Sequence, residues 1–212
     1  MSSIQLPHLY GTGYGSDKAN NTDEYLWQPV LKLLASSTTG SRVLDAGCGN
    51  GFFARQLHEK GFDVVGMDLD ESGIFHARKL CPSVRFEVGS VYDDIGALFG
   101  RQFDVVVALE VIEHLYDPRT FVTRVQECLR PGGLFILSTP YHGYLKNLLI
   151  ALAGKFDSHA TALWDGGHIK FWSRRSLTSL LEQDKRFQVE AFVGAGRLPY
   201  LWKSMVLAAS RL

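Results

Sequence analysis

The sequence predicts an α/β fold with a doubly wound, mostly parallel sheet. Five apolar, strand-like segments alternate with amphipathic helical segments, and this order implies right-handed crossovers between parallel strands. The strand-like segments are almost continuously apolar, as expected for strands that helices cover on both faces. Ligands of such sheets bind at the carboxyl ends of the strands. The residues that follow each strand are therefore the candidates for function.

Length and composition narrow the class of protein. The chain has 212 residues, of which 46% are hydrophobic, so we expect a single domain over 1–212. Lys plus Arg and Asp plus Glu both total 22, and this zero net charge argues against nucleic acid as a partner. Three scattered cysteines suit a reducing compartment. Without a signal-peptide pattern or an apolar run of bilayer length, the expected location is the cytoplasm.

The first 40 residues form the amino-terminal part of the predicted domain. The glycine- and tyrosine-rich stretch 10–15 is either a mobile lid over a ligand or a disordered leader. Apolar residues at helical spacing then predict a helix that starts near Thr22 and ends before Gly40. Pro29 implies either a kink in this helix or a later start.

The stretch 42–51 predicts a short buried strand, a turn with glycines at 47, 49 and 51, and the start of a helix. Glycine removes the Cβ atom where the backbone bends sharply, and it lets a ligand lie against backbone N–H groups. Asp45 stands just before the turn, where its charge would repel the pyrophosphate of a dinucleotide. The turn therefore indicates a ligand that carries positive charge.

The second strand, predicted over 63–70, ends in two acidic residues. Asp68 lies about twenty residues beyond the turn, a spacing that lets a carboxylate bind ribose hydroxyls. We assign this role to Asp68, because Asp70 is the natural N-cap of a helix over 71–80. Asp70 is the alternative ribose ligand.

The remaining core segments follow the same alternation up to Pro140. The apolar helix that comes next is too short to span a bilayer, so it either covers a substrate pocket as a lid, which we favour, or rests on a membrane surface. The predicted segments are strands over 84–91, 103–110 and 134–140, a helix between 117 and 131, the apolar helix over 144–156, a loop over 157–172, a helix over 174–185, and strands near 188–193 and 203–209.

The pattern Asp-x-Gly-x-Gly-x-Gly at 45–51 resembles the first motif of the class I S-adenosylmethionine-dependent methyltransferases, whose cofactor carries a sulfonium and an ammonium group. Segments 110–118, 129–133 and 137–139, followed by the apolar insertion, resemble more closely the ubiquinone-biosynthesis O-methyltransferase group. The resemblance covers roughly 43–181. It implies a Rossmann-like, seven-stranded sheet with an antiparallel last strand and a helical lid insertion after strand five.

The same resemblance implies an organisation and an activity. It implies a cofactor-binding core over 41–140, a substrate-side insertion over 141–172, and a carboxyl-terminal helix and strands over 173–212. The activity implied is methyl transfer from S-adenosylmethionine to a small-molecule acceptor, foremost the hydroxyl of a phenolic, quinone-like or natural-product compound. N-methylation of a small amine and a non-catalytic regulatory domain that binds the cofactor are the alternatives. A dinucleotide-dependent oxidoreductase shares the glycine turn, but Asp45 argues against it.

The resemblance places the cofactor along the ends of the first four strands, with the adenine near the end of the third. The residues assigned to the cofactor are Asp45, Ala46, Gly47, Cys48, Gly49, Gly51, Asp68, Leu69, Ser90, Val91, Leu109 and Glu110.

A hydroxyl acceptor must lose its proton, and histidine is the natural base near neutral pH. His114, at the exit of the fourth strand, and His168, in the loop after the insertion, are the candidates; each also has a purely structural interpretation. In the resembling group, a divalent metal has been associated with residues that correspond to Glu110, Glu113 and His114. Hard oxygen ligands with one imidazole would suit Mg²⁺. Related enzymes carry this motif without a metal, so no metal is assigned.

Overall fold

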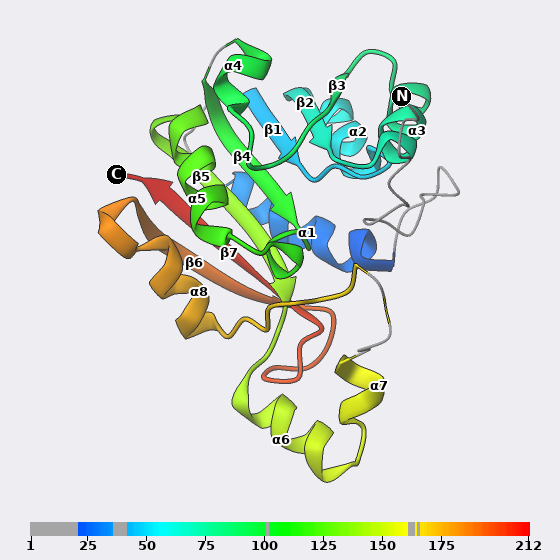
Figure 1. Ribbon diagram of the computed structural model, residues 1–212, viewed down its shortest axis with the longest axis vertical. Helices are drawn as coiled ribbons and strands as arrows, with labels where there is room; N and C mark the ends of the chain where they lie inside the picture. The colour runs from blue at the N-terminus through cyan, green and yellow to red at the C-terminus, as the bar shows by residue number, and fades with distance from the viewer. Residues whose placement is uncertain (1–20, 36–41, 101, 161–163, 165) are drawn as a thin grey trace, which may run out of the picture.

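The computed structural model describes residues 21–35, 42–100, 102–160, 164 and 166–212. Within this part of the chain, seven strands form one sheet in the order β3-β2-β1-β4-β5-β7-β6 (Figure 1). The strands β1 to β5 pair in parallel, and β7 runs antiparallel to both β5 and β6. The predicted α/β class, the seven strands and the antiparallel last strand are thereby confirmed. The order reverses between β1 and β4, which creates a ligand crevice at their carboxyl ends.

The elements follow the predicted alternation. The strands are β1 (Arg42–Ala46), β2 (Asp63–Asp68), β3 (Arg85–Val88), β4 (Phe103–Leu109), β5 (Leu129–Pro140), β6 (Phe187–Ala195) and β7 (Ser204–Arg211). The α-helices are α1 (Asn21–Ala35), α2 (Phe52–Glu59), α3 (Glu71–Leu80), α4 (Ile95–Phe99), α5 (Pro118–Cys128), α6 (Tyr144–Leu152), α7 (Phe156–Ala160) and α8 (Arg174–Leu181). Two 3-10 turns lie at Ile112–His114 and Gln183–Lys185.

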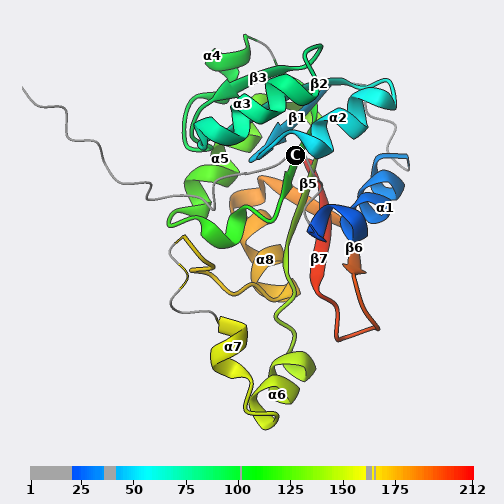
Figure 2. The ribbon, with the colours of Figure 1, turned by 90° about the vertical axis from the view of Figure 1, so that its right-hand side faces the viewer.

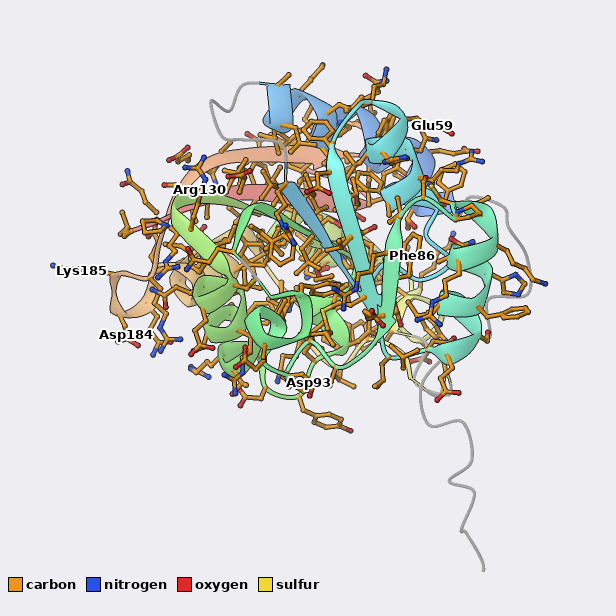
Figure 3. The ribbon with its side chains drawn as sticks, turned by 90° about the horizontal axis from the view of Figure 1, so that it is seen from above. Glu59, Phe86, Asp93, Arg130, Asp184 and Lys185 are labelled. Carbon is orange, nitrogen blue, oxygen red and sulfur yellow. The ribbon has the colours of Figure 1, made fainter. Side chains whose placement is uncertain are left out.

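Helices cover both faces of the sheet (Figure 2). One apolar core joins the sheet to α1, α2 and α3, and the other joins it to α4, α5 and α8. Successive strand residues alternate between them: Val43 belongs to the first core and Leu44 to the second. Seen from above, Phe86 lies inside while the exposed Lys185 lies at the rim (Figure 3). The apolar cores on the two faces of the sheet hold the strand ends, and hence the site, in place.

Several elements differ from the prediction. Strand β3 ends at Val88 and not at 91, and helix α4 lies in a segment for which no element was predicted. The apolar helix is interrupted at Gly154, whose φ of 62° ends the α-helical path, so α6 and α7 are separate helices. The helix after the insertion ends at Leu181, before a 3-10 turn in which Asp184 has a φ of 57°. Strand β5 already begins at Leu129, because this residue pairs with Phe103. Helix α1 starts at Asn21 and runs through Pro29, so a later start is wrong.

The insertion after β5 stands out from the body of the molecule (Figures 1 and 2). Its apolar side chains face outward: Tyr144 is 84% exposed, Leu152 76% and Phe156 63%. No helix in the described ranges is long and apolar enough to cross a bilayer. The stretch 10–15 and the predicted helix end at Gly40 lie outside the described residues. Closure of the insertion over a pocket stays a prediction.

Candidate functional site

The glycine turn connects β1 to α2 at the point where the strand order reverses. Gly47, Gly49 and Gly51 have φ values of 82°, 52° and 76°, a region that L side chains rarely adopt. A Cβ atom on Gly47 would collide with the side chain of Val111, and one on Gly51 would stand 2.7 Å from the Cβ of Ala77 in α3. Gly47 therefore lets the segment after β4 approach the turn, and Gly51 lets α3 approach it.

A cavity of about 530 Å³ opens beside this turn, within the usual volume range of small-molecule sites. Two residues assigned to the cofactor do not line it: Ala46, the last residue of β1, is buried in the core, and Gly51 packs against α3. The assigned residues on its wall are Asp45, Gly47, Cys48, Gly49, Asp68, Leu69, Ser90, Val91, Leu109 and Glu110.

Asp68, at the end of β2, is tied to the glycine turn. The N–H of Gly49 donates to its Oδ2 at 2.8 Å, and the N–H of Asp70 donates to its Oδ1 at 2.9 Å. Burial raises the pKa of the Asp68 carboxyl, and these N–H donors oppose the rise. Asp70 caps α3 by accepting from the N–H groups of Ser72 and Gly73, as predicted. Both carboxylates reach the cavity wall, but only that of Asp68 is anchored to the turn.

Glu110 follows β4 in a strained conformation, with a φ of 55°. Its carboxylate accepts hydrogen bonds from the Oγ of Ser138 at 2.7 Å and the Oγ of Ser204 at 3.1 Å. A further hydrogen bond of 3.0 Å joins the Ser204 Oγ to the hydroxyl of Tyr25 in α1. Burial raises the pKa of Glu110 to about 7. This carboxyl therefore changes its charge near neutral pH, on the cavity wall.

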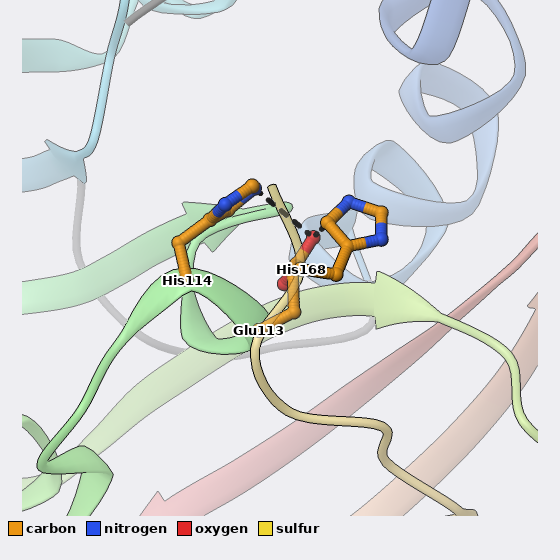
Figure 4. Close-up of side chains that lie close together, drawn as sticks. All are labelled: Glu113, His114 and His168. Atoms are coloured by element: carbon orange, nitrogen blue, oxygen red, sulfur yellow. Dashed lines mark ion pairs between the residues drawn. The ribbon is translucent and has the colours of Figure 1, made fainter. Parts of the chain in front are cut away.

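Glu113, His114 and His168 meet at the exit of β4 (Figure 4). The Oε1 atom of Glu113 lies 4.0 Å from the Nε2 atom of each histidine. Burial raises the pKa of Glu113 well above its usual value, and the charge of Glu110 adds to this rise. The structure thus brings both predicted base candidates to one buried carboxylate. His114 lines the cavity, whereas His168 lies behind it.

Hydrogen bonds fix the loop that carries His168. The N–H groups of Ile169 and Lys170 both donate to the backbone carbonyl of Glu113 at 3.0 Å. The Nδ1 atom of His114 lies 2.9 Å from the carbonyl oxygen of Gly166. A carbonyl only accepts, so Nδ1 carries a proton, and in the neutral tautomer of this ring the lone pair lies on Nε2. Burial, followed by the proximity of His114, lowers the pKa of His168 to about 4, so its imidazole is neutral at pH 7.

The grouping of potential metal ligands differs from the one the sequence motif implies. In the described part of the chain, the ligand atoms of Glu113, His114 and His168 all lie within 4.8 Å of one another. Glu110 is not in this group, because the two serine hydroxyls bind its carboxylate. His168 is the third member of the group, because the fold brings the loop that carries it next to Glu113 and His114.

Sequence reasoning missed part of the cavity wall. Trp164 and Gly166 reach it from the loop after the insertion, and Thr22 reaches it from α1. Trp164 is one of several aromatic residues in and near this loop that the sequence offers either as a wall for a flat acceptor or as packing residues, so only Gly166 and Thr22 depend on the tertiary structure alone. Most of the other lining residues are sequence neighbours of assigned residues. An extension of each assigned segment by one residue would have included them. These others are Asn50, Phe52, Phe53, Gly89, Tyr92, Val111, Leu115 and Tyr116, whereas Asp70, also on the wall, is the predicted alternative ribose ligand.

Comparison with known proteins agrees with this geometry. A family model described as a methyltransferase domain matches residues 19–185. A probable S-adenosylmethionine-dependent methyltransferase of Mycolicibacterium smegmatis is 40% identical over 111 residues, which cover 52% of this chain and 42% of that protein. A ubiquinone biosynthesis O-methyltransferase of Ruegeria sp. (strain TM1040) is 33% identical over 171 residues, which cover 77% and 67%. The chain thus spans about two fifths to two thirds of the length of these curated relatives.

Solved structures share the fold. Magnesium protoporphyrin IX methyltransferase from Synechocystis PCC 6803 with bound SAH superposes with a TM-score of 0.68 at 20% identity, covering 94% of this chain and 91% of that one. A protein from Pyrococcus horikoshii OT3 superposes with a TM-score of 0.70 at 22% identity, covering 97% and 98%. The family model covers more than half of the sequence, and the resemblance seen in the motifs is confirmed by the named relatives. The chain belongs to the methyltransferase domain family.

Proposed function

We propose that the protein transfers a methyl group from S-adenosylmethionine to a hydroxyl of a small-molecule acceptor. The observation that carries this proposal is the set of four carboxylates on the cavity wall, Asp45, Asp68, Asp70 and Glu110, at or near the ends of β1, β2 and β4. Acidic side chains attract a ligand with sulfonium and ammonium groups and repel a pyrophosphate. The cavity therefore suits S-adenosylmethionine better than a dinucleotide.

Each part of this cofactor has a matching part of the wall. Asp68 faces the cavity beside the glycine turn, where a carboxylate accepts hydrogen bonds from ribose hydroxyls. Ser90 and Val91 lie just past the end of β3, beside Asp68 in the neighbouring strand, and offer an edge for the adenine. Asp45 and Glu110 would then interact with the sulfonium and ammonium groups of the cofactor.

Methyl transfer is an in-line displacement in which the sulfonium is already a good leaving group. The protein therefore acts mainly by aligning the nucleophile with the methyl group and by excluding water. A hydroxyl acceptor must also lose a proton. We place this step at the cluster of Glu113, His114 and His168, because the neutral tautomer of His114 that donates from Nδ1 has its lone pair on Nε2 and His114 lines the cavity.

Two observations favour an aromatic hydroxyl as the acceptor. The wall beside His114 carries Trp164 and Tyr116, whose rings can pack against a flat ring. Several relatives are ubiquinone biosynthesis O-methyltransferases by name. A phenolic, catechol-like or quinone-like compound is therefore our proposed acceptor, with N-methylation of a small amine as the alternative chemistry.

Two measurements test the proposal. Calorimetry should show binding of S-adenosylhomocysteine and no comparable binding of NADH; the reverse preference would overturn the cofactor assignment. A screen with radiolabelled methyl donor over phenols, catechols, amines and carboxylates should then label a hydroxyl compound. Labelling of amines alone would replace O-methylation by N-methylation.

A further inference from the structure

We propose that Tyr25 acts through Ser204 to hold the Glu110 carboxylate toward the methyl donor, and that helix α1 is thereby coupled to donor binding. Tyr25 is a positioning residue in this proposal, because Ser204 stands between it and Glu110. The inference deepens the proposed function and rests on the assignment of Glu110 to the cofactor. Four features of the structure support it.

The first feature is the order of donors and acceptors in this chain of hydrogen bonds. The Oγ–H group of Ser204 donates to the Oε2 atom of Glu110 at 3.1 Å. A serine hydroxyl has one hydrogen, so in the 3.0 Å contact with Tyr25 the Ser204 Oγ accepts and the phenol donates. Hydrogen bonds in a chain polarise and strengthen one another. The Tyr25 hydroxyl therefore strengthens the bond that Ser204 makes to the carboxylate.

The second feature is the fixed place of Ser204 in the sheet. It is 1% exposed and is the first residue of β7. Its backbone pairs with Pro140 of β5 on one side and with Ala195 of β6 on the other. Groups on sheet strands are held more precisely than groups on loops. The bridge between Tyr25 and Glu110 is therefore a rigid one.

The third feature is the conformation of Glu110. Its φ of 55° is strained for a residue with a side chain. The Oγ of Ser138 accepts from the N–H of Glu110 at 3.0 Å and donates to its Oε1 at 2.7 Å, so one serine holds both the backbone and the carboxylate. Strained residues persist where the surrounding structure fixes them, and they gather at functional sites. With Ser204 on Oε2, both carboxylate oxygens are fixed on a residue of the cavity wall.

The fourth feature is the place of α1, which also supplies Thr22 to the cavity wall. Thr22 and Tyr25 are three residues apart and lie near one face of the helix. Leu26 and Val30 of the same helix are buried in the core against the sheet. Donor binding and the seating of α1 therefore meet at the wall residue and at the hydrogen-bonded tyrosine. By linkage, each favours the other by the same factor.

The test is a double-mutant cycle on the 212-residue chain, with the affinity for S-adenosylmethionine measured by calorimetry. Tyr25→Phe removes only the phenol hydroxyl and should weaken binding about 2- to 10-fold. Ser204→Ala removes the bridge and should weaken binding at least as much. In the Ser204→Ala background, Tyr25→Phe should have no further effect, because its route to Glu110 is already broken.

The matched control is Tyr200→Phe, which also removes one phenol hydroxyl. Tyr200 is 61% exposed and does not line the cavity, so this variant should bind S-adenosylmethionine like the wild type. A melting transition in each variant shows that it folds. If Ser204→Ala does not fold, the affinity of Tyr25→Phe and its hydrogen exchange decide the outcome.

Hydrogen exchange gives a second readout, which a purely structural role of Tyr25 would not change. S-adenosylmethionine should slow the exchange of α1 amides in the wild type by a larger factor than that of α8 amides. Helix α8 is the internal reference, because it supplies no residue to the cavity wall. In Tyr25→Phe saturated with the ligand, the difference between the two helices should shrink.

The inference is overturned if Tyr25→Phe keeps the wild-type affinity, if the losses in Tyr25→Phe and Ser204→Ala add, or if the ligand slows α1 no more than α8. Failure of the proposed function has a different signature. The wild type then binds no S-adenosylmethionine, and the inference falls with it.

Discussion

The backbone N–H of Gly49 donates to the Oδ2 atom of Asp68 at 2.8 Å, so the glycine turn and the end of β2 hold each other in place. Both residues line the same cavity. In the proposed function, the same carboxylate would bind the ribose of the cofactor. Substitution of Asp68 therefore tests both the position of the turn and the proposed ribose contact.

We expect Asp68→Ala to weaken the binding of S-adenosylhomocysteine by about 1.5 to 3 kcal/mol, because charge-assisted hydrogen bonds are lost. The N–H of Gly49 also loses its acceptor, so the turn should exchange its amide protons faster. Calorimetry and hydrogen exchange measure the two effects.

Asp70→Ala is the control for this variant. It removes the cap of α3 and should lower the free energy of unfolding by about 1 kcal/mol, with little change in affinity. If Asp70→Ala loses affinity and Asp68→Ala does not, the ribose contact belongs to Asp70.

Gly51→Ala should destabilise the fold. It should not affect ligand contacts, because Gly51 does not line the cavity. The new Cβ atom would stand 2.7 Å from the Cβ of Ala77 and 3.0 Å from the Cζ of Phe86, and a φ of 76° disfavours any L side chain. We expect a loss of about 1 to 3 kcal/mol in the free energy of unfolding, measured with urea. In the Ala77→Gly background, the loss caused by Gly51→Ala should be smaller than in the wild type, because the Cβ of Ala77 is absent. An equal loss in both backgrounds would assign the effect to the backbone conformation and the remaining contacts.

The titration of Glu110 predicts how stability depends on pH. Its pKa of about 7 in the folded state lies above the ordinary value of 4.5, so the folded chain binds more protons than the unfolded chain between these values. The free energy of unfolding should therefore fall as the pH rises from about 4.5 to 7. Glu110→Gln should remove this part of the slope, as urea titrations at several pH values would show. An equal slope in both proteins would assign it to another group.

The same carboxyl predicts proton release on cofactor binding. A sulfonium or ammonium group near Glu110 stabilises its ionised form and lowers its pKa. We expect S-adenosylmethionine to bind more tightly as the pH rises from 6 to 8, with release of part of one proton near pH 7. Calorimetry in two buffers of different ionisation enthalpy measures this proton. Glu110→Gln should release none, and equal release from that variant would point to a different acid.

The apolar surface of α6 can be altered without loss of the fold. Leu149 is 44% exposed and Leu152 76% exposed, so replacement of both by glutamine should change the free energy of unfolding by no more than about 0.5 kcal/mol per site. If α6 is a lid, turnover of an apolar acceptor falls in this variant while cofactor affinity stays. If α6 rests on a membrane, co-sedimentation with lipid vesicles falls instead.

The sequence predicts most of the sheet, because buried parallel strands such as β4 consist of continuous apolar runs. It also predicts the cap of α3, since Asp70 precedes a helical pattern. The break at Gly154 was missed because one glycine in an apolar run does not by itself end a helix. Whether a single glycine ends a helix depends on the tertiary structure around it.

The candidate site was less predictable than the sheet. Residues at strand ends, such as Asp68 and Glu110, follow from the topology and reach the cavity. The meeting of His114 with His168 does not follow, because it depends on hydrogen bonds between the backbone of Glu113 and a distant loop. Hydrogen bonds between main-chain atoms cannot be recognised from the residue types.

The loop after the insertion is held through the carbonyl of Glu113, which accepts from the N–H groups of Ile169 and Lys170. These bonds involve only main-chain atoms, so nearly any residue other than proline preserves them. The side chains of Ile169 and Phe171 are 41% and 52% exposed. Changes of side chain at Ile169 and Lys170 therefore leave these two hydrogen bonds, and with them the register of the loop, in place.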